Sequence, residues 1–195
     1  MLAPTRTVAP AAAVSLVLAK KHLRVDHDDE DELIAGYVAA ATERLDGWSG
    51  ILGRCLGVQT WKAYFAGFGG DGSGRLRLPL CPVTEVTEIA YYDQAGASQT
   101  LGQAAWQLLA DFLSPYVSPA PGASLPGTYP REDAISVTFQ AGYAEIPAPL
   151  VSAILLIVGD LYANRETVTF GAGAAEIPMS TSVKALLAPY RAVGF

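Results

Sequence analysis

The sequence predicts an α+β fold, in which an antiparallel β unit is inserted into a helical bundle formed by the two ends of the chain. Apolar residues recur at helical spacing near both ends, whereas the middle of the chain alternates apolar and polar residues at every second position. A block of strands enclosed by helices is typical of the α+β class. We therefore expect a flexible N-terminal arm over residues 1–13, a β unit over residues 56–143, and a helical core from residues 14–55 and 144–195, which ends in a C-terminal tail.

The N-terminal part of the chain carries the signals of two helices. Two prolines punctuate the first ten residues, which read as a mobile arm. Ser15 precedes a short apolar run and is predicted to cap the first helix. In residues 26–32 six of seven side chains are acidic, and carboxylates stabilise the positive end of a helix dipole. Apolar residues at spacings of three and four then predict a longer helix over residues 33–48.

The middle of the chain contains several predicted strands separated by turns. The glycine-rich residues 67–74 indicate a hairpin tip, and residues 106–109 carry no clear pattern. Five prolines lie between residues 114 and 130, so this segment is predicted to be a loop. Strands are predicted over residues 56–65, 75–80, 83–92, 98–101 and 134–141.

Helical spacing returns in the last part of the chain. Pro147 and Pro149 stand where the first turn of a helix tolerates proline, and apolar residues follow at helical spacing as far as Arg165. A last helix is predicted from about residue 181 to residue 188, with Pro189 ending it.

Composition and charge limit the classes of function. The 195 residues suit one domain or a small core with an insertion, and with 51% hydrophobic and only 16% charged residues the chain has apolar surface left for partners. A net charge of -6 is the wrong sign for gripping DNA phosphates over a broad face. Cys55 and Cys81 form no metal-binding motif, which fits a reducing compartment. The apolar runs 8–19 and 151–158 are too short to span a bilayer, which needs about 20 residues.

Two alternative functions start from particular side chains. His22 and His27 flank the acidic stretch and could belong to a small metal-dependent hydrolase, although residues 26–32 lack the glycine and the ligand spacing of a calcium loop. Aromatic residues on presumed strands could instead mark a carbohydrate-binding module, although aromatics at alternating positions more often fill a core. These aromatic residues are Trp61, Tyr64, Tyr91 and Tyr92. We expect no catalytic, cofactor-binding or metal-binding residue.

The most informative polar residues lie near the ends of the C-terminal helices. Arg165 and Glu166 follow a very apolar helix, where they could cap it, pair with a neighbouring helix or bridge to another subunit. Tyr190, Arg191 and Phe195 combine aromatic and cationic character, which suits a partner surface. We therefore regard these five residues as candidates for an oligomer or partner interface.

A series of motifs extends over almost the whole chain from about residue 16. The motifs occupy residues 18–26, 53–56, 59–61, 78–83, 91–96, 139–143, 147–150, 161–166 and 186–191. In this order and spacing they resemble the head-tail connector, or adaptor, proteins of tailed bacteriophages and of phage-derived gene transfer agents. The chain departs from the family at Tyr129-Pro130, where Trp-Pro is frequent, and residues 1–13 match no motif.

The resemblance implies a structural role without an active site or a cofactor. Such connectors form a homo-oligomeric ring, usually a dodecamer, between the portal protein and the stopper or tail protein. DNA passes through the lumen without specific binding, and no membrane is involved. The resemblance further implies a place in the neck of the virion or particle, with assembly in the bacterial cytoplasm. On this view the segment from about residue 179 to Phe195 reaches toward the portal.

Overall fold

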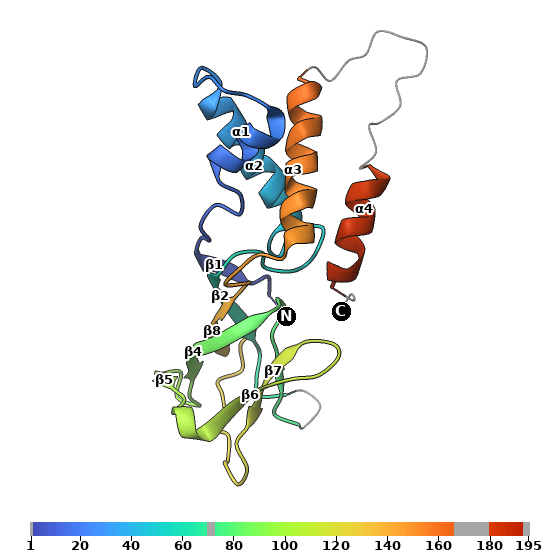
Figure 1. The fold of residues 1–195 in the computed structure, drawn as a ribbon. Helices are drawn as coiled ribbons and strands as arrows, with labels where there is room; N and C mark the ends of the chain where they lie inside the picture. The colour runs from blue at the N-terminus through green and yellow to red at the C-terminus, as the bar shows by residue number, and fades with distance from the viewer. Residues whose placement is uncertain (1, 70–72, 166–179, 193–195) are drawn as a thin grey trace, which may run out of the picture. The chain divides into compact units, whose positions relative to one another are not determined.

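A computed structural model describes residues 2–69, 73–165 and 180–192. The described residues divide into two compact units. Residues 2–10, 57–69 and 73–144 form the β unit, and residues 11–56, 145–165 and 180–192 form the helical unit. The predicted α+β class is confirmed, because helices and antiparallel sheets both occur (Figure 1).

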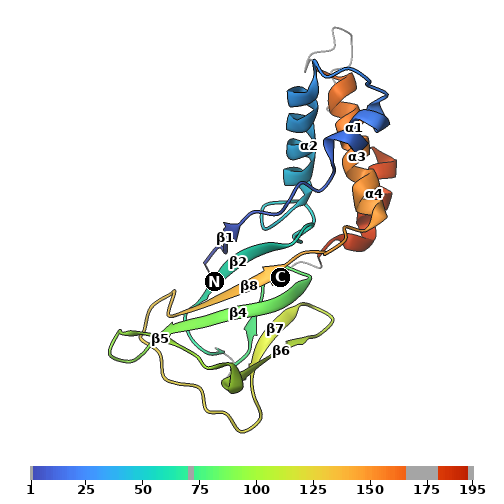
Figure 2. The ribbon, with the colours of Figure 1, turned by 60° about the vertical axis from the view of Figure 1, so that its left-hand side comes forward.

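The β unit contains a five-stranded and a three-stranded antiparallel sheet (Figure 2). The larger sheet has the strand order β1-β2-β8-β4-β5, and the smaller sheet has the order β3-β7-β6. A 3-10 turn, Gln103–Ala105, precedes β6. The strands are β1 (Thr5–Val8), β2 (Gln59–Phe65), β3 (Leu76–Arg77), β4 (Val83–Tyr92), β5 (Ser98–Thr100), β6 (Trp106–Ala110), β7 (Pro115–Pro119) and β8 (Ile135–Ala141).

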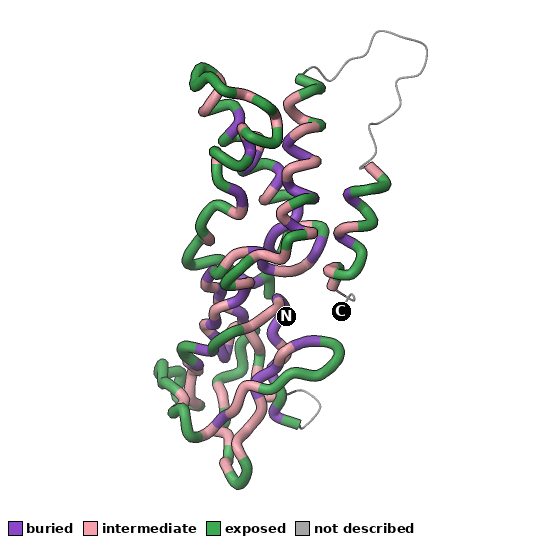
Figure 3. The backbone as a smooth tube through the Cα atoms, viewed as in Figure 1, coloured by how far each residue is buried: buried purple, intermediate pink, exposed green. Residues whose placement is uncertain are grey.

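The core of the β unit is organised by the alternation of side chains along β8. Every second residue of this strand, from Ile135 to Ala141, is buried, as the alternating sequence predicts. Phe139 pairs with Trp61 of β2 and with Val86 of β4, which are buried as well. Figure 3 shows buried backbone segments in both units. Hydrophobic side chains from three neighbouring strands therefore cover one face of the larger sheet.

Two β-unit segments differ from the sequence-based expectations. Residues 1–13 were expected to form a flexible arm, but Thr5–Val8 forms β1 and pairs with β2. Backbone N–H and C=O groups at the edge of β2 can form hydrogen bonds with an extended segment, which explains the pairing. A cation–π contact adds to it, because the guanidinium of Arg6 lies 5.9 Å from the ring centre of Trp61. Residues 115–119 were expected to be loop but form β7, whose two prolines occupy its first and last positions, where the ladder tolerates them.

The helical unit is built from α1 (Leu16–Leu23), α2 (Asp31–Leu45), α3 (Ala148–Ala163) and α4 (Thr181–Leu187), followed by a 3-10 turn, Ala188–Tyr190. The predicted cap is confirmed, because the hydroxyl of Ser15 accepts a hydrogen bond from the backbone N–H of Leu18 at 3.2 Å. The buried residues of α2 recur at spacings of four and three, from Ile34 to Leu45. They pack against α3, whose buried residues run from Leu150 to Val158.

The segment after α2 is held by a buried carboxylate. Asp46 is only 5% exposed, and one of its carboxylate oxygens accepts a hydrogen bond from the backbone N–H of Leu56 at 2.7 Å. The chain also passes so close to itself here that a Cβ at Gly50 would lie 2.4 Å from the carbonyl oxygen of Asp46. The predicted helix over residues 33–48 therefore ends earlier, at Leu45, and the chain turns back toward Leu56.

In the part of the chain that the structure describes, no helix has both the length and the apolar character that a membrane crossing requires.

Replacing Asp46 by alanine should destabilise the helical unit. The variant Asp46→Ala leaves the N–H of Leu56 buried without this acceptor, which costs about 1–3 kcal/mol. Urea unfolding followed by helical circular dichroism measures the loss. The control is Asp26→Ala, which removes an exposed carboxylate of the same unit and should change stability by less than about 0.5 kcal/mol. Equal stability of the two variants would contradict the structural role of Asp46.

Candidate functional site

The sequence-predicted interface residues that the structure describes lie in the helical unit. Arg165 follows the end of α3 by two residues, and Tyr190 and Arg191 follow α4. Glu166 and Phe195 lie outside the described residues. The described candidates therefore occupy the ends of two different helices.

Arg165 is engaged by a carboxylate of its own chain. Its guanidinium lies 2.7 Å from Oε1 of Glu30, directly before α2, and its central carbon lies 4.5 Å from the ring centre of Tyr162. The hydroxyl of Tyr162 donates a hydrogen bond to the other carboxylate oxygen of Glu30. Hydrogen bonds from Tyr162 and then Arg165 hold the pKa of Glu30 below its ordinary value, because they stabilise the charged form. The three side chains join the start of α2 to the end of α3.

A second charged cluster joins α1 to α2. The ammonium of Lys20 donates hydrogen bonds to Asp28 and Asp31, both at 2.6 Å, and the Lys20 side chain is only 14% exposed. The hydrogen bond from Lys20 lowers the pKa of Asp28. The acidic residues before and at the start of α2 therefore also form ion pairs within the chain, with Lys20 and with Arg165.

The histidines that could have supported a metal-dependent hydrolase do not converge. His27 pairs loosely with Asp29, at 3.8 Å, whereas His22 lies beside Gly159 of α3. Among residues 2–69, 73–165 and 180–192, no group of three or more His, Cys, Asp or Glu side chains is placed to hold a metal ion.

The aromatic residues that could have marked a carbohydrate site are used within the β unit. Trp61 is 6% exposed, and its indole N–H donates to the side chain of Gln59 at 3.1 Å. Tyr92 lies 4.1 Å from the guanidinium carbon of Arg131, and Tyr91 makes an edge-to-face contact with Phe68. A buried Trp61 cannot stack on a sugar, so the carbohydrate-binding alternative loses the tryptophan among its four aromatic residues.

The C-terminal segment is attached through its backbone. The Nε of Arg54 donates to the carbonyl oxygen of Tyr190 at 2.9 Å, and the N–H of Ala192 donates to the carbonyl oxygen of Leu52 at 2.9 Å. The Arg191 side chain is exposed between these two attachment points. The geometry thus presents Arg191 to solvent on a fixed backbone, which is a suitable arrangement for contact with a partner.

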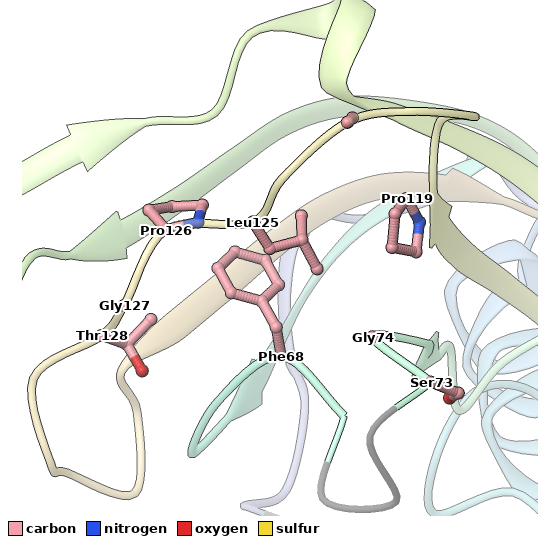
Figure 4. Close-up of a pocket in the computed structure, with 9 residues that line it drawn as sticks. Phe68, Ser73, Gly74, Pro119, Leu125, Pro126, Gly127 and Thr128 are labelled. Carbon is pink, nitrogen blue, oxygen red and sulfur yellow. The ribbon is translucent and has the colours of Figure 1, made fainter.

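Two surface features of the β unit were not found by sequence reasoning. Phe112, between β6 and β7, is 91% exposed. A pocket of about 490 Å³ is lined by residues that include Phe68, Pro119, Leu125 and Pro126 (Figure 4). The apolar pair Phe112-Leu113 after a turn-forming aspartate was the available signal for the first feature. The pocket brings together segments far apart in sequence, so no local pattern could reveal it.

Comparisons with known proteins agree with the resemblance found in the sequence. Residues 14–100 match the family model described as "Phage gp6-like head-tail connector protein". No curated protein sequence matches the chain.

Several solved structures contain chains of similar fold. A chain from the neck of an empty gene transfer agent (GTA) particle computed with C6 symmetry is 25% identical, with a TM-score of 0.75 over 100% of this chain and 97% of that chain. A chain from the virion of a native GTA particle is 26% identical, with a TM-score of 0.74 and the same coverage. A chain from the neck of a native GTA particle computed with C12 symmetry is 27% identical, with a TM-score of 0.64 over 97% of both chains.

The family model supports the resemblance over residues 14–100, and the solved structures support it over the rest of the chain. The chain is thus similar to the phage head-tail connector family over residues 14–100 and to chains of GTA particles over 97–100% of its length, as its ordered motifs predict.

Proposed function

We propose that this protein is a structural head-tail connector that forms a homo-oligomeric ring in the neck of a tailed phage or gene transfer agent particle. The observation that carries the proposal is the fold similarity over the full chain to a protein in the neck of a GTA particle. The C12 symmetry of one related neck supports a dodecameric ring. In this role the chain works through its contacts and needs neither an active site nor a cofactor.

The surface of the described residues supports assembly. Exposed large hydrophobic residues occur in both units, among them Trp48 and Ile51 in the helical unit and Phe112 in the β unit. A ring requires two different contact surfaces on each subunit, because neighbouring subunits meet head to tail. The net charge of -6 suits a lumen through which DNA slides without specific binding, since acidic surfaces repel phosphates.

The C-terminal segment is our candidate for contact with the portal protein. Hydrogen bonds to Arg54 and Leu52 hold its backbone, while the Arg191 side chain remains exposed. Tyr190 would add an aromatic contact beside this cation, and Phe195 remains a candidate for the same interface by its sequence alone. The stopper or tail protein would bind elsewhere on the ring, and assembly would take place in the bacterial cytoplasm.

For Arg165 we propose a supporting role at this interface. Its guanidinium pairs with Glu30 and lies over Tyr162, so it positions the end of α3. A partner at this end would meet a surface whose charged side chains are already ordered, which reduces the entropy lost on binding.

The proposed function is tested by locating and counting the protein in particles purified from the producing bacterium. We expect a fixed number of copies per particle, located in the neck by electron microscopy, and a mass that is a multiple of the 20.5 kDa subunit. Complete, DNA-filled particles without this protein would contradict the proposal.

Reversing the charge at Arg191 should weaken incorporation into particles without unfolding the subunit. We expect the variant Arg191→Glu to keep its thermal midpoint, because the side chain is exposed. We also expect its incorporation into particles to fall about tenfold, which corresponds to a loss of about 1.4 kcal/mol in binding free energy. Quantitative mass spectrometry of purified particles measures incorporation. The control Lys21→Glu reverses an exposed charge on α1, and an equal loss in both variants would contradict a specific role for Arg191.

Removing the charge of Glu30 should alter stability in a pH-dependent way. The folded-state pKa of Glu30 lies below its ordinary value of 4.5, so its contribution is complete above the unfolded-state pKa and is lost as pH falls through the folded-state pKa. We expect Glu30→Gln to lower the urea midpoint at pH 7, and the difference from the wild type to shrink between about pH 5 and pH 3. The exposed β4 variant Glu88→Gln is the control. A difference that stays constant with pH would show that the charge of Glu30 does not stabilise the fold.

A further inference from the structure

The β6–β7 connection presents an apolar tip to solvent. We define the Phe112 tip as residues 109–114, in which Phe112 is 91% exposed and Leu109 and Leu113 are also exposed. Three large apolar side chains at one connection are unusual for a surface that meets only water, because transferring each of them out of water is favourable. The tip is therefore suited to contact with another molecule.

The backbone of the tip is ordered before any partner binds. Oδ1 of Asp111 accepts hydrogen bonds from the N–H groups of Leu113 at 2.9 Å and Ser114 at 3.1 Å. The two oxygens of the same carboxylate accept hydrogen bonds from Arg77 of β3 at 3.0 and 2.7 Å. A bidentate Arg–carboxylate pair fixes orientation as well as distance. Phe112 is consequently held out on a fixed turn, and binding need not order the loop first.

The same unit contains a pocket that can receive such a side chain. The Phe68 pocket combines the apolar side chains of Phe68, Pro119, Leu125 and Pro126 with the polar side chains of Ser73 and Thr128, and its volume of about 490 Å³ accommodates a phenyl ring (Figure 4). Its floor includes Gly74, where a Cβ would lie only 2.8 Å from Pro119 and 2.9 Å from Leu125. The backbone at Gly74 thus packs closely against Pro119 and Leu125, and only glycine fits this approach.

The occupant of this pocket follows from symmetry. In a cyclic ring, each subunit contacts its two neighbours through two different surfaces, so a protruding group on one surface needs a receiving site elsewhere on the same chain. The Phe112 tip is not in the pocket of its own chain, since the phenyl ring is almost fully exposed. The β unit thus carries both an exposed aromatic side chain and a pocket large enough for a phenyl ring.

We propose that Phe112 of one subunit inserts into the Phe68 pocket of the next copy of the chain, and that this contact links the β units around the ring. The proposal rests on the proposed function, because only a ring gives every tip a pocket. It assigns the neighbour contact to the β unit and leaves the C-terminal segment of the helical unit for the portal.

Cross-linking in assembled particles tests which molecule the tip meets. One tagged version of the full chain carries Phe112→Cys, a second version carries Leu125→Cys, and particles assembled from both are treated with a short bismaleimide. We expect a product that contains one chain of each kind. The control pairs Leu125→Cys with Ala95→Cys, an exposed position in the β4–β5 turn, and wild-type chains give the background from Cys55 and Cys81. The absence of the mixed product, or a product that joins Phe112→Cys to a different particle protein, would overturn the proposal.

Removal of the phenyl ring tests its contribution to assembly. We expect Phe112→Ser to keep the wild-type circular dichroism spectrum and to enter particles about tenfold less, as at an interface hot spot. The control Tyr129→Ser removes an aromatic side chain that is 43% exposed in the same unit, and it should enter normally. Wild-type incorporation of Phe112→Ser would overturn only this inference, whereas particles that lack the wild-type protein would overturn the proposed function itself.

Discussion

The β unit depends on the burial of one side of β8. This strand pairs with β2 on one edge and β4 on the other, and Ile135, Val137 and Phe139 are fully buried beneath the sheet. A shift of one residue in either pairing would move these side chains to the opposite face, so their burial specifies the register of both neighbours. The fixed register also fixes where the loops next to these strands begin, including the loop after β2 that carries Phe68 of the pocket.

Patterns with a short period allowed much of the fold to be predicted from the sequence. The spacing of apolar residues located α2, α3 and β8, because each of these elements buries one face more deeply than the other. The pattern fails where burial does not alternate. All four residues of β1 are exposed, so its pairing with β2 depends on backbone hydrogen bonds that leave no trace in hydrophobicity. The prolines of β7 predict a loop, but they stand at the first and last positions of the strand, where they do not prevent pairing of the residues between them.

The candidate sites show a similar division. Arg165 and Arg191 stood out in the sequence as charged residues beside apolar helices, and their surroundings then differed in the structure. Arg165 pairs with Glu30, a residue far away in the chain, whereas the Arg191 side chain is exposed between two backbone attachments. Such partners depend on tertiary packing, so sequence spacing alone could not distinguish them. For the same reason the sequence did not predict the Phe68 pocket, whose lining residues come from segments far apart in the chain. The exposed Phe112 did have a local signal, because the turn-forming Asp111 directly precedes it.

The proposed neighbour contact also explains why subunits with exposed apolar side chains would not associate before they are assembled into a particle. An aromatic hot spot contributes about 2 to 4 kcal/mol, whereas bringing two proteins together costs about 4 to 15 kcal/mol in lost motion. One inserted phenyl ring is therefore too weak to hold two free subunits together. When subunits are already held side by side on a portal, each insertion becomes an intramolecular event at a high effective concentration. Under the proposed function the same contact would then become favourable around the whole ring, so that closure would follow attachment to a portal and would not precede it.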